Sequence, residues 1–177
     1  MKLAKPDFNA IPQFTRSSSY GVDVSWTYLL SHYEDHVQNY GLEINPDFQR
    51  GHVWDATKQI KFVEFVLRGG RSAKELQFNC VGWQHSDDLG EYVLVDGLQR
   101  LTAAIRFMKN EIPAFGYKFK EFSGNLRIHS PSFRWNVNDL DTRAEVLTWY
   151  LELNSGGVVH TDDELDRVRT LLEAEGK

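Results

Sequence analysis

The stretch YVLVDGLQRLTAAIRF, residues 92–107, predicts a strand, a tight turn and a helix in immediate succession. Residues 92–95 are apolar and rich in β-branched side chains, as buried strands are. Gly97 permits a tight turn, and apolar side chains then recur with helical spacing at Leu98, Leu101, Ile105 and Met108. The pattern therefore places a carboxylate, Asp96, where a buried strand meets a helix.

Helix signals lie on both sides of this unit. Ser25 and Asp55 are suited to cap helices, because their side-chain oxygens accept hydrogen bonds from backbone N–H groups that lack a helical partner. The helix after Asp55 is expected to end at Gly69-Gly70. Residues 142–152 have helical character, and Thr161 with Glu164 forms a capping box for a last helix.

Further strands are expected from alternation and from β-branched or aromatic runs. They cover residues 20–24, 41–45, 76–83, 117–122 and 132–137, with a polar turn over residues 84–90. There is no internal repeat and no linker long enough to separate two domains. We therefore predict an N-terminal arm over residues 1–19 and a single α+β domain over residues 20–177.

Composition narrows the functional classes. The 177 residues include 20 basic and 25 acidic side chains, a net charge of −5, which disfavours general binding to polyanions but leaves room for a local basic patch. Cys80 is the only cysteine, so neither an internal disulfide nor a cysteine zinc cluster is available. Without a signal peptide or a run of about 20 apolar residues, the expected location is the cytoplasm.

The 96–100 segment carries the densest chemical signal. The first turn of a helix has unpaired N–H groups and a partial positive charge, so it binds anions, and Gln99 and Arg100 add donors there. Asp96 is suited to hold Mg²⁺ accompanying phosphates or to orient a water molecule. Three structural alternatives stand beside this hypothesis: Asp96 as a helix cap, Gly97 as a turn residue, and Arg100 paired with a surface carboxylate.

Two other segments could contribute to a site. Gln49 and Arg50 lie on the connection into a helix, where functional residues concentrate. Asn154 with Gly156-Gly157 could form an anion-binding nest, although a helix end followed by an ordinary loop explains the same residues. His52 is solitary and no H-x-x-H pair occurs, so a histidine metal site has little support.

The segments together resemble a known family. Their order is P-D-F-Q-R-x-x-V-W from Pro46, an apolar helix ending in L-R-G, V-D-G-x-Q-R-L-T from Val95, and L-N-x-G-G from Leu153. This order resembles the DGQQR-signature domain, the N-terminal half of GmrSD-type modification-dependent restriction enzymes. That domain belongs to the ParB/sulfiredoxin-like superfamily. The resemblance covers residues 20–168.

The resemblance implies a ParB/sulfiredoxin-like α+β fold, with a small mixed sheet flanked by helices, that binds a nucleoside triphosphate and, in several members, hydrolyses it. Asp96, Gln99 and Arg100 would then be catalytic, with Asp96 also the ligand of Mg²⁺ or another divalent cation. The residues that would bind the phosphates, because they match the family motifs, are Gln49, Arg50, Gly97, Asn154 and Gly157. The expected setting is phage–host DNA restriction in the cytoplasm of a bacterium or phage-infected cell.

Two departures from the family pattern matter. Leu98 replaces the usual first glutamine of the signature, and helical spacing predicts that it points inward. No H-N-H metal finger is present, so we expect no DNA cleavage by this chain alone. Expected partners are a nucleotide, DNA or a separate nuclease subunit, and a second copy of the chain. Two alternatives remain beside the enzyme: a ParB-like DNA-binding or nuclease module, and a catalytically silent interaction protein.

Overall fold

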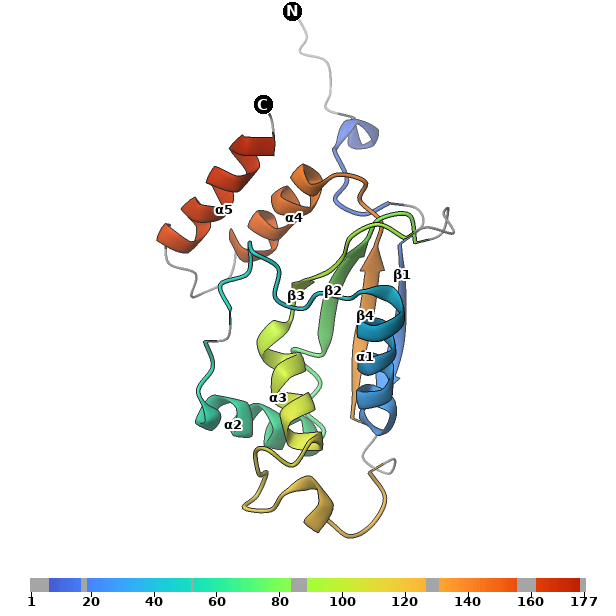
Figure 1. The fold of residues 1–177 in the computed structure, drawn as a ribbon, viewed down its shortest axis with the longest axis vertical. Helices are drawn as coiled ribbons and strands as arrows, with labels where there is room; N and C mark the ends of the chain where they lie inside the picture. The colour runs from blue at the N-terminus through green and yellow to red at the C-terminus, as the bar shows by residue number, and fades with distance from the viewer. Residues whose placement is uncertain are drawn as a thin grey trace, which may run out of the picture.

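The computed structural model describes residues 7–16, 19–51, 53–83, 89–126, 131–155 and 162–175. The chain forms one α+β unit (Figure 1). Its elements run in the order η1 (Phe8–Ala10), β1 (Tyr20–Ser25), α1 (Trp26–Tyr40), α2 (Ala56–Leu67), β2 (Glu75–Cys80), β3 (Tyr92–Asp96), α3 (Leu98–Met108), η2 (Phe119–Glu121), β4 (Ser132–Asn138), α4 (Arg143–Ser155) and α5 (Asp162–Glu175).

The four strands form one mixed sheet in the order β1-β4-β2-β3. The central pair, β2 and β4, is parallel, whereas β1–β4 and β2–β3 are antiparallel. Glu43 lies along the outer side of β3: its N–H donates to Tyr92 O and its carbonyl accepts from Leu94 N, both over 2.9 Å. The predicted α+β fold with a small mixed sheet flanked by helices is confirmed.

Two apolar cores lie on opposite faces of the sheet. The larger core buries alternate residues of the strands, such as Leu94 and Trp135, under α1, α2 and α3. The smaller core buries the intervening residues Val93 and Val95 of β3 against α4, α5 and Phe48. Because β3 is buried on both faces, its sequence is continuously apolar rather than alternating. Asp96 follows at the point where this burial ends.

The predicted helix caps are present. Ser25 Oγ accepts a hydrogen bond from Thr27 N over 3.3 Å at the start of α1, and Asp55 Oδ1 accepts from Lys58 N over 2.8 Å at the start of α2. These caps depend only on neighbouring residues, so local sequence was sufficient to identify them. Thr161 of the expected third cap lies outside the described residues.

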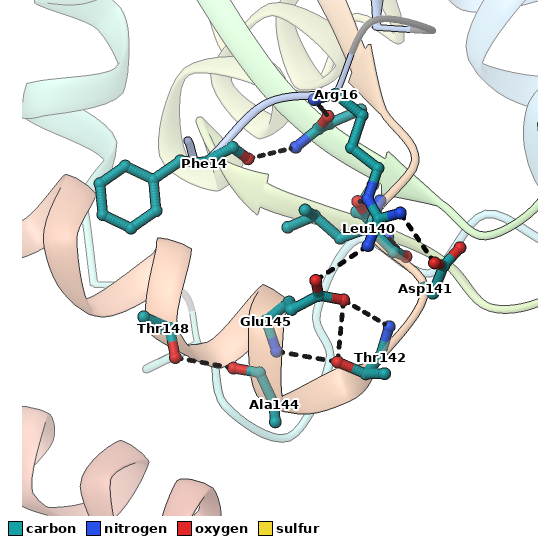
Figure 2. A network of polar contacts seen from close by, with 10 residues as sticks. Phe14, Arg16, Leu140, Asp141, Thr142, Ala144, Glu145 and Thr148 are labelled. Atoms are coloured by element: carbon teal, nitrogen blue, oxygen red, sulfur yellow. Dashed lines mark hydrogen bonds and ion pairs between the residues drawn. The ribbon is translucent and has the colours of Figure 1, made fainter. Parts of the chain in front are cut away.

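Part of the expected N-terminal arm lies against the domain (Figure 2). Asn138 at the end of β4 bonds the arm twice: its Oδ1 accepts from Arg16 N over 3.1 Å, and its Nδ2 donates to Phe14 O over 2.8 Å. The Arg16 guanidinium pairs with Asp141 over 2.8 Å and with Glu145 over 2.9 Å. These contacts attach residues 14–16 to the junction between β4 and α4.

Some strand predictions were wrong. Residues 117–122 do not form a strand: Tyr117 makes a single bridge with Ala114, and Phe119–Glu121 then coil into η2. Alternation alone does not make a strand, because a strand needs a neighbour that accepts and donates its backbone hydrogen bonds. Residues 41–45 contribute only the single bridge at Glu43. The strand expected over 76–83 ends at Cys80, where a turn begins, and residues 84–88 of the expected polar turn lie outside the described residues.

Candidate functional site

Asp96 and Arg100 meet across the junction of β3 and α3. Arg100 Nη2 donates to Asp96 Oδ2 over 2.6 Å and to the carbonyl of Glu75, at the start of β2, over 2.9 Å. The Asp96 side chain is 40% exposed, whereas that of Arg100 is 21% exposed. Arg100 Nε is buried and has no hydrogen-bond partner among the described residues. The pair therefore combines a solvent-facing carboxylate with a guanidinium whose donors are only partly used.

Gly97 forms the turn between them and is the N-cap of α3, with φ at 113°. No side chain caps this helix, so Asp96 does not act as the cap that one structural alternative required. A Cβ on Gly97 would lie 2.4 Å from Leu76 Cδ2, so the turn also depends on the close approach of β2. The positive end of α3 is therefore not occupied by a capping side chain.

Gln99 holds the loop that precedes α2. Its Oε1 accepts from the N–H groups of Val53 over 3.1 Å and Trp54 over 3.0 Å, and its Nε2 donates to Gly51 O over 2.8 Å. A side-chain amide thus stands in for a backbone partner along this loop. In the structure Gln99 therefore holds this loop, and the catalytic role that the resemblance implies for it stays a prediction.

Gln49 fixes the same loop to the end of β3. Its Nε2 donates to Leu94 O over 3.0 Å and to Val95 O over 2.9 Å, directly before Asp96. Arg50 follows and is partly buried. The structure thus brings the two segments at 49–50 and 96–100 together, although about 50 residues separate them in the sequence.

Leu98, the departure from the family signature, is buried at 6% exposure in the larger core. The expectation that it points inward is confirmed. A glutamine amide at this position would need a partner inside the core. The local environment therefore accounts for the leucine without any change to the polar groups of the site.

An ionic network that sequence reasoning missed anchors the other side of the loop. Arg143, at the start of α4, bonds Asp47 and also pairs with Glu91 over 3.6 Å and Glu175 over 3.4 Å. Arg167 on α5 donates to the Asp47 carbonyl over 2.8 Å. Hydrogen bonding to Asp47 raises the pKa of Arg143. No local pattern marks Arg143, because its partners come from three distant parts of the chain.

The third predicted segment is only partly visible. Asn154 lies in the last turn of α4, and its Nδ2 donates to Tyr150 O over 2.7 Å within the same helix. Tyr150 packs on Phe48 with a centroid distance of 5.2 Å, so this end of α4 is near the loop that carries Gln49. Among the described residues, Asn154 forms no hydrogen bond with residues 49–50 or 96–100. Gly157 lies outside the described residues.

The family comparison gives a match that covers residues 30–135, more than half of the chain, to the model described as GmrSD restriction endonuclease, N-terminal domain. The chain belongs to the GmrSD N-terminal domain family. The resemblance recognised from the motifs is thereby confirmed. Comparisons with curated proteins and with solved structures gave no match.

The matched range separates the candidate residues of this GmrSD N-terminal domain into two groups. It includes Gln49, Arg50 and the whole segment from Asp96 to Arg100, which the structure brings together. It ends before α4, so Asn154 and Gly157 lie outside it. Among the described residues, no helix is long and apolar enough to cross a membrane. Within the same ranges, no group of three or more His, Cys, Asp or Glu side chains is placed to hold a metal ion.

Proposed function

We propose that this GmrSD N-terminal domain binds a nucleoside triphosphate at the start of α3 and hydrolyses it with a divalent cation, as the nucleotide-responsive part of a restriction system. The observation that carries the proposal is an uncapped helix N-terminus beside an arginine with an unused buried donor. The N–H groups and the guanidinium are of the kinds that bind phosphate oxygens. Family membership supports the restriction setting.

Arg100 is proposed to contact the phosphates. Both hydrogen bonds of Arg100, to Glu75 O and to Asp96 Oδ2, use Nη2. The other guanidinium nitrogens therefore retain donors for an incoming anion. A buried donor without a partner carries a desolvation penalty, which an anion would remove. Pairing with Asp96 holds the guanidinium beside the helix terminus before any ligand arrives. Such preorganisation favours stabilisation of charge that develops on a transferring phosphoryl group.

Asp96 is proposed to be the protein ligand of the cation. Its Oδ2 pairs with Arg100, and Oδ1 has no hydrogen-bond partner among the described residues, so one oxygen remains for a metal or a water molecule. A magnesium ion needs only one or two carboxylates when phosphate oxygens and waters complete its shell, and it would neutralise charge on those phosphates. The single half-exposed carboxylate of Asp96 fits this requirement.

We propose that the loop before α2 forms the side of the nucleotide site opposite Asp96 and Arg100. Its residues in this role are Gln49 and Arg50, together with Gln99, which holds the loop. The two glutamines hold the loop through five hydrogen bonds to backbone atoms. These bonds keep the backbone of Arg50 near the end of β3, and we propose that its side chain extends from there to the ligand. We assign Gln99 a positioning role, because its amide is engaged with the loop. Asn154 and Gly157 are proposed as further phosphate contacts only through the family motif.

Calorimetric titration with ATP, GTP, CTP and UTP, each with and without Mg²⁺, tests binding, and phosphate release tests turnover. We expect heat of binding for at least one nucleotide and Mg²⁺-dependent release of inorganic phosphate. Hydrogen exchange of the bound protein should show slowed exchange at the amides of residues 98–100. If none of the four nucleotides binds at millimolar concentration with Mg²⁺, the proposal is wrong.

DNA binding is the second candidate, because exposed basic residues gather on α2 and the turn after it. Lys58, Lys61, Arg68 and Arg71 are exposed, with Lys74 partly buried beyond them. Among the described residues none of these five forms an ion pair, so their charges are available to phosphates. A gel shift that weakens with salt in the wild type, and is lost in Lys58→Gln/Lys61→Gln, would support this candidate. No shift at low salt on plain or modified duplexes would exclude it.

A further inference from the structure

A pocket of about 850 Å³ is lined by residues at the C-terminal ends of α2 and α3 and by residues 115–126 of the segment that follows α3. Figure 1 shows the course of that segment beyond the two helices. Its walls include four phenylalanines and two cations: Phe107, Phe115, Phe119, Phe122, Arg68 and Lys120. Phe107 is nine residues beyond Leu98 on α3, which corresponds to about 14 Å along the helix axis. The pocket is therefore separate from the proposed nucleotide site at the start of the same helix.

One wall of the pocket is a turn that places a phenylalanine in a backbone conformation unfavourable for bulky residues. Ala114 N donates to Tyr117 O over 2.8 Å, and Tyr117 N donates to Ala114 O over 2.9 Å, which leaves Phe115-Gly116 as a two-residue loop. Both residues have positive φ, 50° and 82°, as in a type I′ turn. Such a turn favours asparagine, aspartate or glycine at its first position, because a bulky side chain is strained there. Phenylalanine is therefore not explained by the turn itself.

Core packing does not explain this phenylalanine either. The Phe115 side chain is 38% exposed and is not among the buried core residues, yet it lines the pocket. Its N–H donates to Glu64 Oε1 over 2.7 Å, which fixes the turn to α2. The Arg68 guanidinium carbon lies 5.0 Å from the centre of the Phe115 ring, within the range of a cation–π contact. The strained residue thus presents an aromatic surface with a cation held beside it.

The charges of the pocket have one sign. Arg68 and Lys120 line it, whereas no aspartate or glutamate among the described residues does. Among the described residues, neither cation forms an ion pair, and the nearby Glu64 carboxylate is engaged by the backbone of the turn. Phe107 also meets Phe119 and Phe122 edge to face, with centroid distances of 5.5 and 6.0 Å. The pocket therefore combines aromatic walls with two cations that form no ion pair with the rest of the described chain.

We propose that this pocket binds a small planar aromatic anion, a flat ring system bearing a carboxylate or phosphate. The volume lies within the range of small-molecule sites. Phenylalanine walls favour a flat ring through stacked and edge-to-face contacts, and the two cations provide the counter-charge. The site adds a ligand to the domain beyond the nucleotide proposed above, and its test does not depend on that nucleotide.

A titration of the whole chain with 2-naphthoate, followed in ¹H–¹⁵N correlation NMR spectra, tests the proposal. We expect saturable shifts at Arg68, Phe115 and Lys120, and weaker binding, by about tenfold or more, of the uncharged 2-naphthalenemethanol. Octanoate has the charge without the ring and should also bind more weakly. Adenosine monophosphate, tested in parallel, distinguishes a nucleotide-like phosphate from an aromatic carboxylate as the preferred form.

Two variants separate binding from folding. Phe115→Asn supplies the residue that the turn favours, so we expect an unchanged or higher Tm together with loss of naphthoate binding. Arg68→Gln should weaken naphthoate about tenfold and leave the affinity for the alcohol unchanged. Naphthoate shifts that are absent, or that arise at residues 96–100 instead, would overturn the proposal. So would wild-type naphthoate affinity in either variant, or an alcohol that binds as tightly as the anion.

Discussion

Arg100 Nη2 lies 2.6 Å from Asp96 Oδ2, one helical turn apart, so the carboxylate at the end of β3 pairs with α3 instead of capping it. The same nitrogen also donates to the backbone of β2. This arrangement leaves the helix N-terminus without a side-chain cap, and it joins β2, β3 and α3 at one point. The proposed nucleotide chemistry depends on this relationship.

Asp96→Asn is expected to remove most of the Mg²⁺-dependent nucleotide turnover, because the amide keeps the shape of the side chain but loses the charge that holds a cation. A fall of about a hundredfold or more in phosphate release is expected. The Asp96 side chain is 40% exposed, and exposed ion pairs stabilise little, so Tm should change by only a few degrees. Phosphate release and thermal melting check the two parts.

Asp141→Asn is the matched control for this prediction. Asp141 is also an exposed aspartate paired with an arginine, Arg16, over 2.8 Å, but it lies at the junction of β4 and α4. It should leave turnover unchanged. Equal turnover in Asp96→Asn and wild type would contradict the assignment of Asp96.

Gln99→Ala is expected to loosen the loop before α2, because three hydrogen bonds to Gly51, Val53 and Trp54 disappear. Each such bond contributes about 1 kcal/mol net, so the free energy of unfolding should fall by about 1–3 kcal/mol. Hydrogen exchange at the amides of Val53 and Trp54 should accelerate. Gln99→Glu, which can still accept from both amides, should retain most of their protection, and equal acceleration in the two variants would argue against this role.

Gly97→Ala is expected to destabilise the domain by about 2 kcal/mol or more. The backbone φ of 113° disfavours any Cβ, and the added atom would lie 2.4 Å from Leu76 Cδ2. Gly41→Ala is the control: its φ is 66°, and a Cβ there meets no atom within 4 Å, so only the backbone cost of about 1 kcal/mol applies. Urea unfolding measures both, and equal losses would show that contact with β2 is unimportant.

Stability should fall between neutral and mildly acidic pH because of two histidines on α1. Burial, and then the neighbouring His36, lower the pKa of His32 to about 4, and burial also lowers that of His36. Unfolded histidines titrate near 6.5, so between about pH 6.5 and 4 the unfolded chain binds more protons than the folded one. The free energy of unfolding therefore decreases as pH falls through this window.

Urea unfolding at pH 7.5 and 5 checks this prediction, with an expected loss on the order of 2 kcal/mol. His32→Phe keeps a ring against Trp135, whose centroid lies 4.8 Å from that of His32, and should reduce the loss. If the wild type is equally stable at both pH values, the folded histidines are not held neutral.

Much of the fold could be predicted because its signals are local. The apolar run of β3, the helical spacing of α3 and the caps at Ser25 and Asp55 each depend on residues within a few positions of one another. The strand predicted over residues 117–122 was wrong, because alternating residues form a strand only where another strand lies alongside to share hydrogen bonds. The pairing of β2 with β3 and β4 could not be predicted from local pattern either, since distant residues decide which strands pair and in which register.

By itself, the sequence determined the family, the α+β class and the segments at 49–50 and 96–100, because motif order and periodicity are properties of the chain alone. Only the tertiary structure decided what those residues touch. It engaged Gln99 with a loop about 45 residues away, paired Asp96 with Arg100, and tied Asp47 to Arg143 on α4. Polar side chains have several possible partners in sequence, and folding selects among them by the packing of elements that are distant along the chain.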